Sequence, residues 1–188
     1  MKKLKEATRE QHEQMETTVD IMNRMFSLAD YNRLLEKFYR FYSAIEPRIA
    51  AVDLGNLGFD FDKRRKTALL ENDLKNIKGK TDMADWTDLP SVDSPAQAFG
   101  CLYVLEGATL GGQVITRHLK QHLGLTPENG GSFFNSYGAE VGAMWKAFAV
   151  SVTQFAEEYN SDDTIIDAAK GTFDSFRRCM VEEAAAVS

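Results

Sequence analysis

The chain has 188 residues, of which 44% are hydrophobic and 27% are charged. A chain of this length is expected to form one domain, residues 1–188, and to bury about 70% of its unfolded surface without disulfides or a structural metal. The formal net charge of -6 and the isoelectric point near 5.1 argue against nucleic acid or an anionic membrane as the main partner, because neither is attracted to an acidic surface.

Cysteine usage and the N-terminal segment indicate a soluble, cytoplasmic protein. Cys101 and Cys179 are the two cysteines of the sequence, and their spacing matches no metal site. Such thiols are typical of a reducing compartment, and we expect both to be buried packing residues. No apolar run approaches the roughly 18 residues that a membrane-spanning helix requires, and the charged N-terminus lacks an apolar signal core.

The stretch over residues 4–16 predicts a helix with an apolar row and a charged row. It contains no helix breaker, and side chains in a helix are separated by about 100° per residue. His12 lies between the two rows, so the helix offers an apolar floor, an imidazole and two cations. This combination suits a flat ligand with a metal centre and acidic groups. The apolar row is Leu4, Thr8, Met15, Val19 and Met22, and the charged row is Lys5, Arg9 and Glu16.

The remaining sequence predicts further helices joined by polar loops. Apolar residues recur at three- and four-residue steps, without strand alternation or an internal repeat. Ser27 and Asp30 form a loose capping box at the start of the second helix, and Pro47 is expected to kink or split it. We therefore predict an all-α fold of six or more helices, with a long connector over residues 78–92. The expected helices cover roughly residues 3–23, 31–52, 61–77, 94–122, 140–159 and 161–186.

The longest expected helix contains a glycine-rich segment at residues 106–113. Each glycine in a helix interior costs about 1 kcal/mol relative to alanine, so Gly107, Gly111 and Gly112 together cost on the order of 3 kcal/mol. Gly107 and Gly111 lie one turn apart with Ala108 beside them, which leaves a strip of bare backbone. A neighbouring helix or a planar ligand can occupy such a strip, and the glycines also permit a kink or hinge.

Two segments together resemble the paired signature of the haem oxygenases. They are residues 4–12, which end at His12, and residues 103–115, which read YVLEGATLGGQVI. Both occur in the order and at the separation found in that family. The second segment is most similar to the branch of bacterial enzymes that supply biliverdin to bacteriophytochromes. Further likeness at residues 132–134, 137–138 and 172–173 extends the resemblance over nearly the whole chain.

The resemblance implies roles for the residues of the first segment. His12 matches the proximal ligand of haem iron. Glu16, one turn further on, is expected to hold the imidazole ring or a ligated water by hydrogen bonding. Lys5 and Arg9 match basic residues that pair with the haem propionates, and Lys146 is expected to be another propionate-binding cation across the pocket.

The resemblance also implies a distal wall. Gly107, Gly111 and Gly112 match the glycines that let the backbone approach bound oxygen and direct it towards a meso carbon of the ring. Many family members have an aspartate where this chain has Ala108, and that aspartate anchors the water that delivers protons. Alanine cannot do this, so a backbone carbonyl near Gly107 with ordered water is the expected substitute. Tyr137 is expected to join this network or to contact a propionate.

Aromatic residues along the expected helices fit either a haem wall or a general core. Phe173 belongs to one of the matching segments and is expected to contact haem. The other members of this set are Phe38, Phe41, Tyr42 and Phe176.

Two further groups have simple structural explanations. His118 and His122 are four residues apart, as in some metal sites, but no third ligand follows, and cations are favoured in the last turns of a helix. The run of Lys63, Arg64, Arg65 and Lys66 is expected to be a solvated basic face, with docking of an electron-donating reductase as the functional alternative.

These observations predict a haem-degrading monooxygenase. As the resemblance implies, haem is both cofactor and substrate, and O2 and electrons from an external reductase or ferredoxin convert it to biliverdin, carbon monoxide and ferrous iron. No phosphate-binding glycine turn follows a strand, so we expect no bound nicotinamide donor. A haem carrier or sensor without turnover is the first alternative, because of Ala108. A helical interaction protein whose glycine face packs against a partner is the second.

Overall fold

The computed structural model describes residues 1–21 and 27–182 of the chain. Within these residues it contains eight α-helices, three short 3-10 helices and no strand, which confirms the all-α prediction. The α-helices are α1 (Lys2–Ala7), α2 (Arg9–Val19), α4 (Leu28–Ala50), α5 (Thr67–Asn76), α6 (Pro95–Leu123), α7 (Ser132–Asn135), α8 (Val141–Tyr159) and α9 (Asp162–Val181). The 3-10 helices are η1 (Gly55–Leu57), η2 (Asp62–Arg64) and η3 (Gly138–Glu140).

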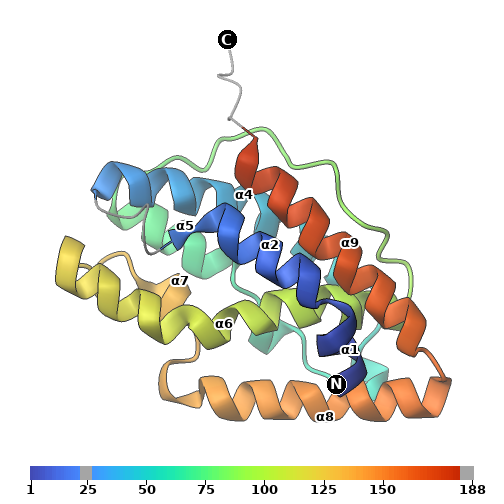
Figure 1. Ribbon diagram of the computed structural model, residues 1–188. Helices are drawn as coiled ribbons and strands as arrows, with labels where there is room; N and C mark the ends of the chain where they lie inside the picture. Colours follow the sequence, from blue (N-terminus) through green and yellow to red (C-terminus); the bar gives the residue numbers. More distant parts are fainter. Residues whose placement is uncertain (22–26, 183–188) are drawn as a thin grey trace.

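The long helix α6 crosses the middle of the molecule and packs most extensively against α9 (Figure 1). It begins as the sequence predicts, with Ser94 as N-cap and Pro95 in the first turn, and it ends at Gly124 in the left-handed conformation. Gly100 lets α9 approach closely, because a Cβ there would lie 2.5 Å from the carbonyl oxygen of Ile165. Helix α8 packs on another side of α6, along the lower edge in Figure 1.

The N-terminal segment forms two helices instead of the predicted single one. The Thr8 hydroxyl donates to the Leu4 carbonyl oxygen at 2.9 Å, and the Thr8 backbone leaves the helical conformation with φ -105° and ψ 7°. Helix α2 then ends at Val19, since Asp20 is left-handed with φ 38°. The expected continuation to residue 23, including Met22, lies outside the described residues.

The second and third predicted helices differ from expectation in opposite ways. Helix α4 starts at the predicted Ser27 cap and is not split by Pro47, which lies in its last turn where few backbone hydrogen bonds depend on it. The third is divided, because Arg65 is extended with ψ 140° between η2 and α5. The buried carboxylate of Glu46, on α4, accepts the backbone N–H of Lys66 and the hydroxyl of Thr67, which fixes the start of α5.

The connector between α5 and α6 is extended, as predicted, and runs along the outer side of α9 (Figure 1). The Trp86 indole donates to the Ser175 hydroxyl at 3.0 Å, and that hydroxyl donates to the Asp88 carbonyl oxygen. The Asp88 carboxylate pairs with Arg178. These contacts hold α9 from outside, on the side away from α6.

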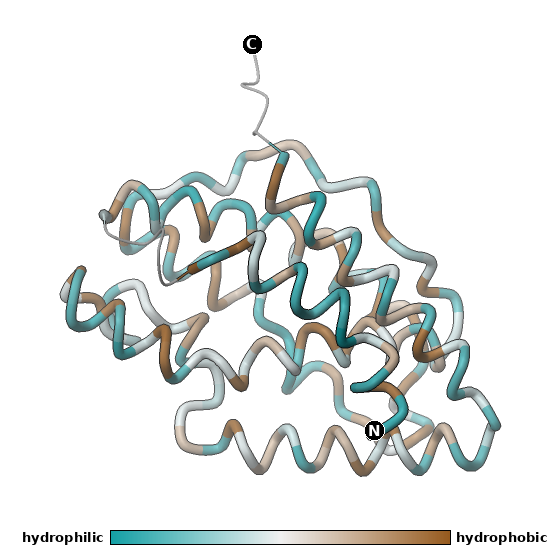
Figure 2. Tube along the Cα trace, viewed as in Figure 1, coloured by the Kyte–Doolittle hydropathy of each residue, from teal (hydrophilic) through white to brown (hydrophobic). Residues whose placement is uncertain are grey.

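Helix α6 is an exception to the expectation that no apolar run is long enough to span a membrane. Among the described residues it is the one helix long and apolar enough to cross a membrane by length and composition, with a mean hydropathy of 1.3 over its most apolar window. However, 61% of that window is buried inside the fold, as in the core helix of a globular domain. Figure 2 shows the same pattern, with hydrophobic residues concentrated where α6 passes beneath the other helices.

The last predicted helices agree with the structure. Helix α8 starts one residue after the expected position and ends at Tyr159, and α9 starts at Asp162. The expected extension of the last helix to residue 186 lies beyond the described residues. The largest fully buried side chains of the core are Tyr31, Tyr42, Phe41, Phe99, Phe148, Leu35, Ile45, Ile49, Leu70, Leu74 and Leu102.

Candidate functional site

A cavity of about 890 Å³ lies between α2 and α6. Its volume is within the range of sites that enclose a cofactor-sized ligand. Helix α2 provides one wall and the glycine-rich segment of α6 provides the other, and α9 and α8 contribute Phe173 and Trp145. Further aromatic side chains line the cavity. They are Phe38, Tyr42, Phe133, Phe134 and Phe176.

His12 lines this cavity from α2. Its Nδ1 lies 3.7 Å from Oε2 of Glu16, one turn further along the helix, and its ring meets the Phe173 ring edge-on at 5.9 Å between centroids. Its side chain is 56% exposed. A carboxylate beside Nδ1 favours the tautomer that leaves Nε2 free to bind a metal.

The cavity is polar at one end and apolar at the other. Helices α2 and α6 run in the same direction across the molecule (Figure 1). Lys5 and Arg9 line the cavity near the start of α2. Its other end is lined mainly by apolar side chains, Val19 and Ile21 from the α2 side and Leu110 and Val114 from α6, with Asp20 beside them. Leu110 and Val114 are 47% and 49% exposed, so this end offers apolar surface to a ligand.

The three glycines in the glycine-rich segment of α6 face different surroundings. Among the described residues, a Cβ at Gly111 would meet nothing within 4 Å, and one at Gly107 would meet only the Trp145 ring, at 3.9 Å. Both glycines line the cavity. At Gly112, however, a Cβ would lie 2.1 Å from the carbonyl oxygen of Phe134. The bare strip at Gly107 and Gly111 therefore faces open space, and Gly112 serves packing against the chain itself.

Ala108 lines the cavity beside this strip and is exposed. It therefore occupies the position expected from the resemblance but presents only a methyl group. Glu106, two residues earlier, is 1% exposed and does not line the cavity. The first carboxylate on this part of α6 is thus turned away from the space that Ala108 faces.

Glu106 is the centre of a buried charged cluster behind the distal wall. Its Oε2 is paired with Arg64 and its Oε1 with Lys66 at 3.3 Å. The Tyr137 hydroxyl donates to the same Oε1 at 2.7 Å and lies 2.5 Å from Nζ of Lys66. Burial lowers the pKa of Lys66 and raises the pKa of the Tyr137 phenol, with Glu106 adding to the rise.

This cluster corrects the expectation for the basic run at residues 63–66. Lys63 and Arg65 are exposed, but Arg64 is 8% and Lys66 is 3% exposed. The carboxylate of Glu106 on another helix draws the two cations inward, and no short-range pattern in the run signals this. The run is therefore not a continuous solvated face.

Three predicted site residues do not line the cavity. Gly112 packs on Phe134, and Tyr137 belongs to the buried cluster. Lys146 is exposed on α8, because its neighbour Trp145 takes the position that faces the cavity and successive residues of a helix point about 100° apart. Lys146 therefore does not line the cavity in this structure, and its pairing with a propionate stays a prediction.

The sequence assigned no role to several residues that line the cavity, among them Tyr103, Trp145 and Lys66. Tyr103 precedes the glycine-rich segment by one turn and lines the cavity, as do Trp145 and Lys66. Tyr103 was inside the matched segment, and its helical spacing of four residues from Gly107 is a signal that places both on one face. Lys66 had no such signal, since a salt bridge 40 residues away determines its position.

The histidine pair in α6 forms no recognisable metal site. The rings of His118 and His122 lie 4.3 Å apart, but within residues 1–21 and 27–182 no group of three histidine, cysteine or acidic side chains could hold a metal ion. His118 is buried, so packing explains at least one member of the pair.

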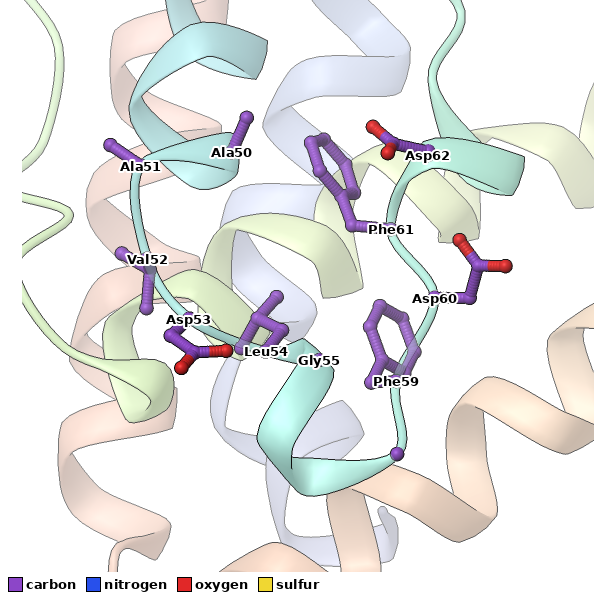
Figure 3. Close-up of a pocket in the computed structure, with 11 residues that line it drawn as sticks. Ala50, Ala51, Val52, Asp53, Leu54, Gly55, Phe59, Asp60, Phe61 and Asp62 are labelled. Atoms are coloured by element: carbon purple, nitrogen blue, oxygen red, sulfur yellow. The ribbon is translucent and has the colours of Figure 1, made fainter.

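A second, open pocket, of about 560 Å³, is lined by residues 50–55 and 58–62 (Figure 3). Its three carboxylates point in separate directions around the rim. Each has a partner nearby: Asp53 with Asn56, Asp60 with Lys63, and Asp62 with Arg65. This cavity therefore lacks a convergent polar group that would orient a ligand.

Comparison with known proteins agrees with the geometry of the larger cavity. A family model described as haem oxygenase matches residues 1–182. The chain belongs to the haem oxygenase family. It is 28% identical over 155 residues to a haem oxygenase of Xanthomonas campestris pv. campestris, which covers 82% of this chain and 90% of that protein.

Two solved haem oxygenase structures share the fold. The NO- and CO-bound haem oxygenase of Neisseria meningitidis has a TM-score of 0.81 at 21% identity, covering 100% of this chain and 96% of that chain. The haem oxygenase of Leptospira interrogans has a TM-score of 0.74 at 20% identity, covering 94% and 96%. As a member of this family, the protein is a haem-degrading oxygenase, and the family reaction cleaves haem to biliverdin, carbon monoxide and ferrous iron.

Proposed function

We propose that the cavity between α2 and α6 is the haem site of this oxygenase and that His12 binds the iron. The observation that carries this proposal is the bare backbone strip of Gly107 and Gly111, which faces the cavity opposite the helix that carries His12. No side chain of the described residues fills the space above Gly111. A planar ligand between the two helices accounts for glycines that the protein's own packing does not require.

The residues around the cavity fit haem in polarity as well as in shape. Lys5 and Arg9 supply two cations for its propionates, while Leu110 and Val114 match its apolar edge. Glu16 keeps the imidazole of His12 oriented, since its Oε2 is near Nδ1. Phe173 packs edge-on to the imidazole and limits rotation of the ring.

Each of these residues acts on the binding of haem, on its orientation or on the access of water to it. Bound haem supplies the iron centre at which oxygen is activated. His12, Lys5 and Arg9 would hold and orient the haem, and the bare backbone at Gly107 and Gly111 would leave room for it on the α6 side. Ala108 adds no acidic group there, so protons must come from another source.

The electron donor and the use of the product are part of the same proposal. The donor is an external reductase or ferredoxin, and a bacteriophytochrome is a candidate acceptor of biliverdin. The likeness of residues 103–115 to one bacterial branch supports the second point. A cytoplasmic location is consistent with such partners and stays a prediction.

A haem carrier or sensor is the second candidate function, and Ala108 favours it because the distal wall lacks the family's carboxylate. A helical interaction protein is no longer favoured, since the glycine strip faces a cavity. Titration with ferric haem followed by reductant under air separates the first two. We expect loss of the haem absorption with formation of biliverdin, whereas a stable reduced or oxygenated complex would indicate a carrier.

The assignment of His12 is tested by His12→Ala, with His122→Ala as a matched control on α6. We expect His12→Ala to lose the axial imidazole signature in resonance Raman or electron paramagnetic resonance spectra of the haem complex, and His122→Ala to keep it. Unchanged iron ligation in His12→Ala would refute the assignment. Absence of haem uptake by the unmodified protein would refute the site as a whole.

A further inference from the structure

The buried cluster behind α6 has one member that reaches the haem cavity. Among Arg64, Lys66, Glu106 and Tyr137, only Lys66 lines the cavity. Its Nζ is 3.3 Å from Glu106 Oε1, 2.6 Å from the Arg64 carbonyl oxygen and 2.5 Å from the Tyr137 hydroxyl. Its side chain therefore connects the interior of the cluster to the cavity wall.

Because of the charges in this cluster, the proton that can be removed is that of Lys66 and not that of Arg64. Two cations, Arg64 and Lys66, share the single carboxylate of Glu106. If Lys66 loses a proton, Arg64 still neutralises Glu106, so no buried charge is left unpaired. Arginine keeps its proton at any ordinary pH, which leaves lysine as the group that can titrate.

Other charged groups near Lys66 do not remove the excess of two cations over one carboxylate in this cluster. The carboxylate of Glu46, from α4, accepts the backbone N–H groups of Lys66 and Thr67 and pairs with Arg65. Tyr42, also from α4, is a buried phenol with a raised pKa. Desolvation outweighs the attraction of Glu106 and Glu46, so the pKa of Lys66 is lowered, and Arg64 contributes to that lowering.

Tyr137 gives the cluster an outer end. It is only half-buried, and its hydroxyl contacts both Lys66 and Glu106. Hydrogen bonds thus connect the half-buried Tyr137 to Nζ of Lys66, the member of the cluster that lines the cavity. No acidic side chain on the cavity face of the glycine strip competes with this connection, since Ala108 occupies the nearest position.

We propose that Lys66 supplies protons to the haem cavity and that Tyr137 reloads it from solvent. An N–H bond of the Lys66 ammonium breaks and its proton passes, through water, to an acceptor in the cavity. The Tyr137 hydroxyl then donates its proton to the neutral Nζ and takes another from water on its outer side. One proton crosses the wall, and the cluster returns to its starting charge. This inference rests on the proposed haem site.

A purely structural Lys66 is the rival explanation, in which the ammonium only ties η2 and α6 together. The two differ in what the lysine does with its proton. A structural lysine keeps it at every pH at which the protein is folded. A proton-supplying lysine titrates below the ordinary value of about 10.4 and exchanges with solvent through Tyr137.

The first test uses the haem-free protein and so does not depend on haem chemistry. Heteronuclear NMR of the ¹⁵N-labelled lysine side chains, assigned with Lys66→Arg, measures the pKa of Lys66 directly. We expect a value below the ordinary one, and slower exchange of the Lys66 ammonium protons in Tyr137→Phe. An ordinary pKa, or exchange that is indifferent to Tyr137→Phe, overturns the proposal.

The second test is the acid–alkaline transition of the ferric haem complex, followed by its visible absorption. A cation near the ring favours loss of a proton there, so Lys66→Met is expected to raise the transition by about one pH unit, and Lys66→Arg to leave it near the wild-type value. An unchanged transition in Lys66→Met overturns the proposal. Circular dichroism checks that each variant is folded. Failure of the wild type to bind haem would instead count against the proposed function.

Discussion

Gly111 and Gly112 are neighbours in α6, yet the space beside each is of a different kind. A side chain at Gly112 would collide with the Phe134 carbonyl oxygen, whereas one at Gly111 would project into the cavity. Gly112 is therefore required by the folded chain itself, and Gly111 by whatever occupies the cavity. Substituting each with alanine separates these two requirements.

We expect Gly112→Ala to lower the free energy of unfolding by about 2 kcal/mol or more, because the Phe134 backbone must move. Gly111→Ala is expected to raise it by about 0.5 to 1 kcal/mol, since alanine favours a helix, while weakening haem affinity. Urea denaturation and haem titration measure the two effects. Equal stability of the two variants would contradict this reading of the glycine strip.

A second prediction at the scale of one residue concerns the thiol of Cys101. It is fully buried beside the Thr172 hydroxyl, 3.2 Å from Sγ, and burial raises the pKa of the thiol from 9.0 to about 11. Between these values the unfolded chain loses the proton and the folded chain keeps it, so stability falls as pH rises through this window.

The expected loss from Cys101 is about 2 kcal/mol, measured by urea denaturation between pH 9 and 11. Cys101→Ala is expected to show a smaller fall over the same range. Alkylation by iodoacetamide gives an independent check, because a protonated, buried thiol reacts slowly in the native protein. Rapid labelling of Cys101 in the folded state would show that the thiol is accessible.

At the scale of elements, the contact between α6 and α9 determines where the cavity walls stand. Gly100 lies at this contact, and a Cβ there would be 2.5 Å from Ile165 O and 2.6 Å from the Ala168 Cβ. Phe173 and Phe176 follow on α9 and line the cavity. A shift of α9 at Gly100 is therefore transmitted to the aromatic side of the cavity.

Gly100→Ala is accordingly expected to cost about 1 to 3 kcal/mol of stability through forced separation of two packed helices. Gly142 in α8 provides the matched control, because a Cβ there would meet nothing within 4 Å. Gly142→Ala is expected to be neutral or slightly stabilising. Thermal denaturation compares the pair, and a neutral Gly100→Ala would show that α9 tolerates displacement.

The helices also show which parts of the fold could be predicted from the sequence. Apolar periodicity and caps such as Ser94 and Gly124 predicted α6 closely, because these signals are local. The breaks at Thr8 and Arg65 were missed. Thr8 bonds back to Leu4 without a sequence signal that distinguishes it from other threonines, and Arg65 is extended because Glu46, from a different helix, binds the following backbone.

The residues of the candidate site also divide into those that local sequence could place and those that it could not. Lys5, on α1, is only a few residues from Arg9 and His12 on the adjoining α2, so spacing and family resemblance placed them together, and all three line the cavity. Lys66 and Trp145 come from distant segments and reach it only through tertiary packing. Local spacing contains no information about which face of another helix they will meet.

At the scale of the whole molecule, haem is expected to act as a stabilising ligand of an already folded chain. A ligand at one hundred times its dissociation constant adds about 2.7 kcal/mol to stability. For a domain of this size that corresponds to a rise of about 5 to 10 °C in Tm. Differential scanning calorimetry with increasing haem measures the shift.

Iron-free protoporphyrin IX is the matched ligand control for this experiment. It presents the same ring and propionates to Lys5 and Arg9 but lacks the iron that His12 is proposed to bind. We expect a smaller rise in Tm with protoporphyrin than with haem in the wild type, and equal rises in His12→Ala. A His12→Ala protein that still distinguished the two ligands would count against iron ligation by this residue.

The packing of α2 on α9 also determines when the site can form during synthesis. Helix α2 carries His12 near the start of the chain, while α9 ends at Val181, and the two helices pack together. A ribosome adds residues in order from the N-terminus at about 5 to 20 per second, so α2 leaves the exit tunnel many seconds before its support does. The nascent chain therefore holds His12 without the cavity, which can form only after translation of α9 is complete.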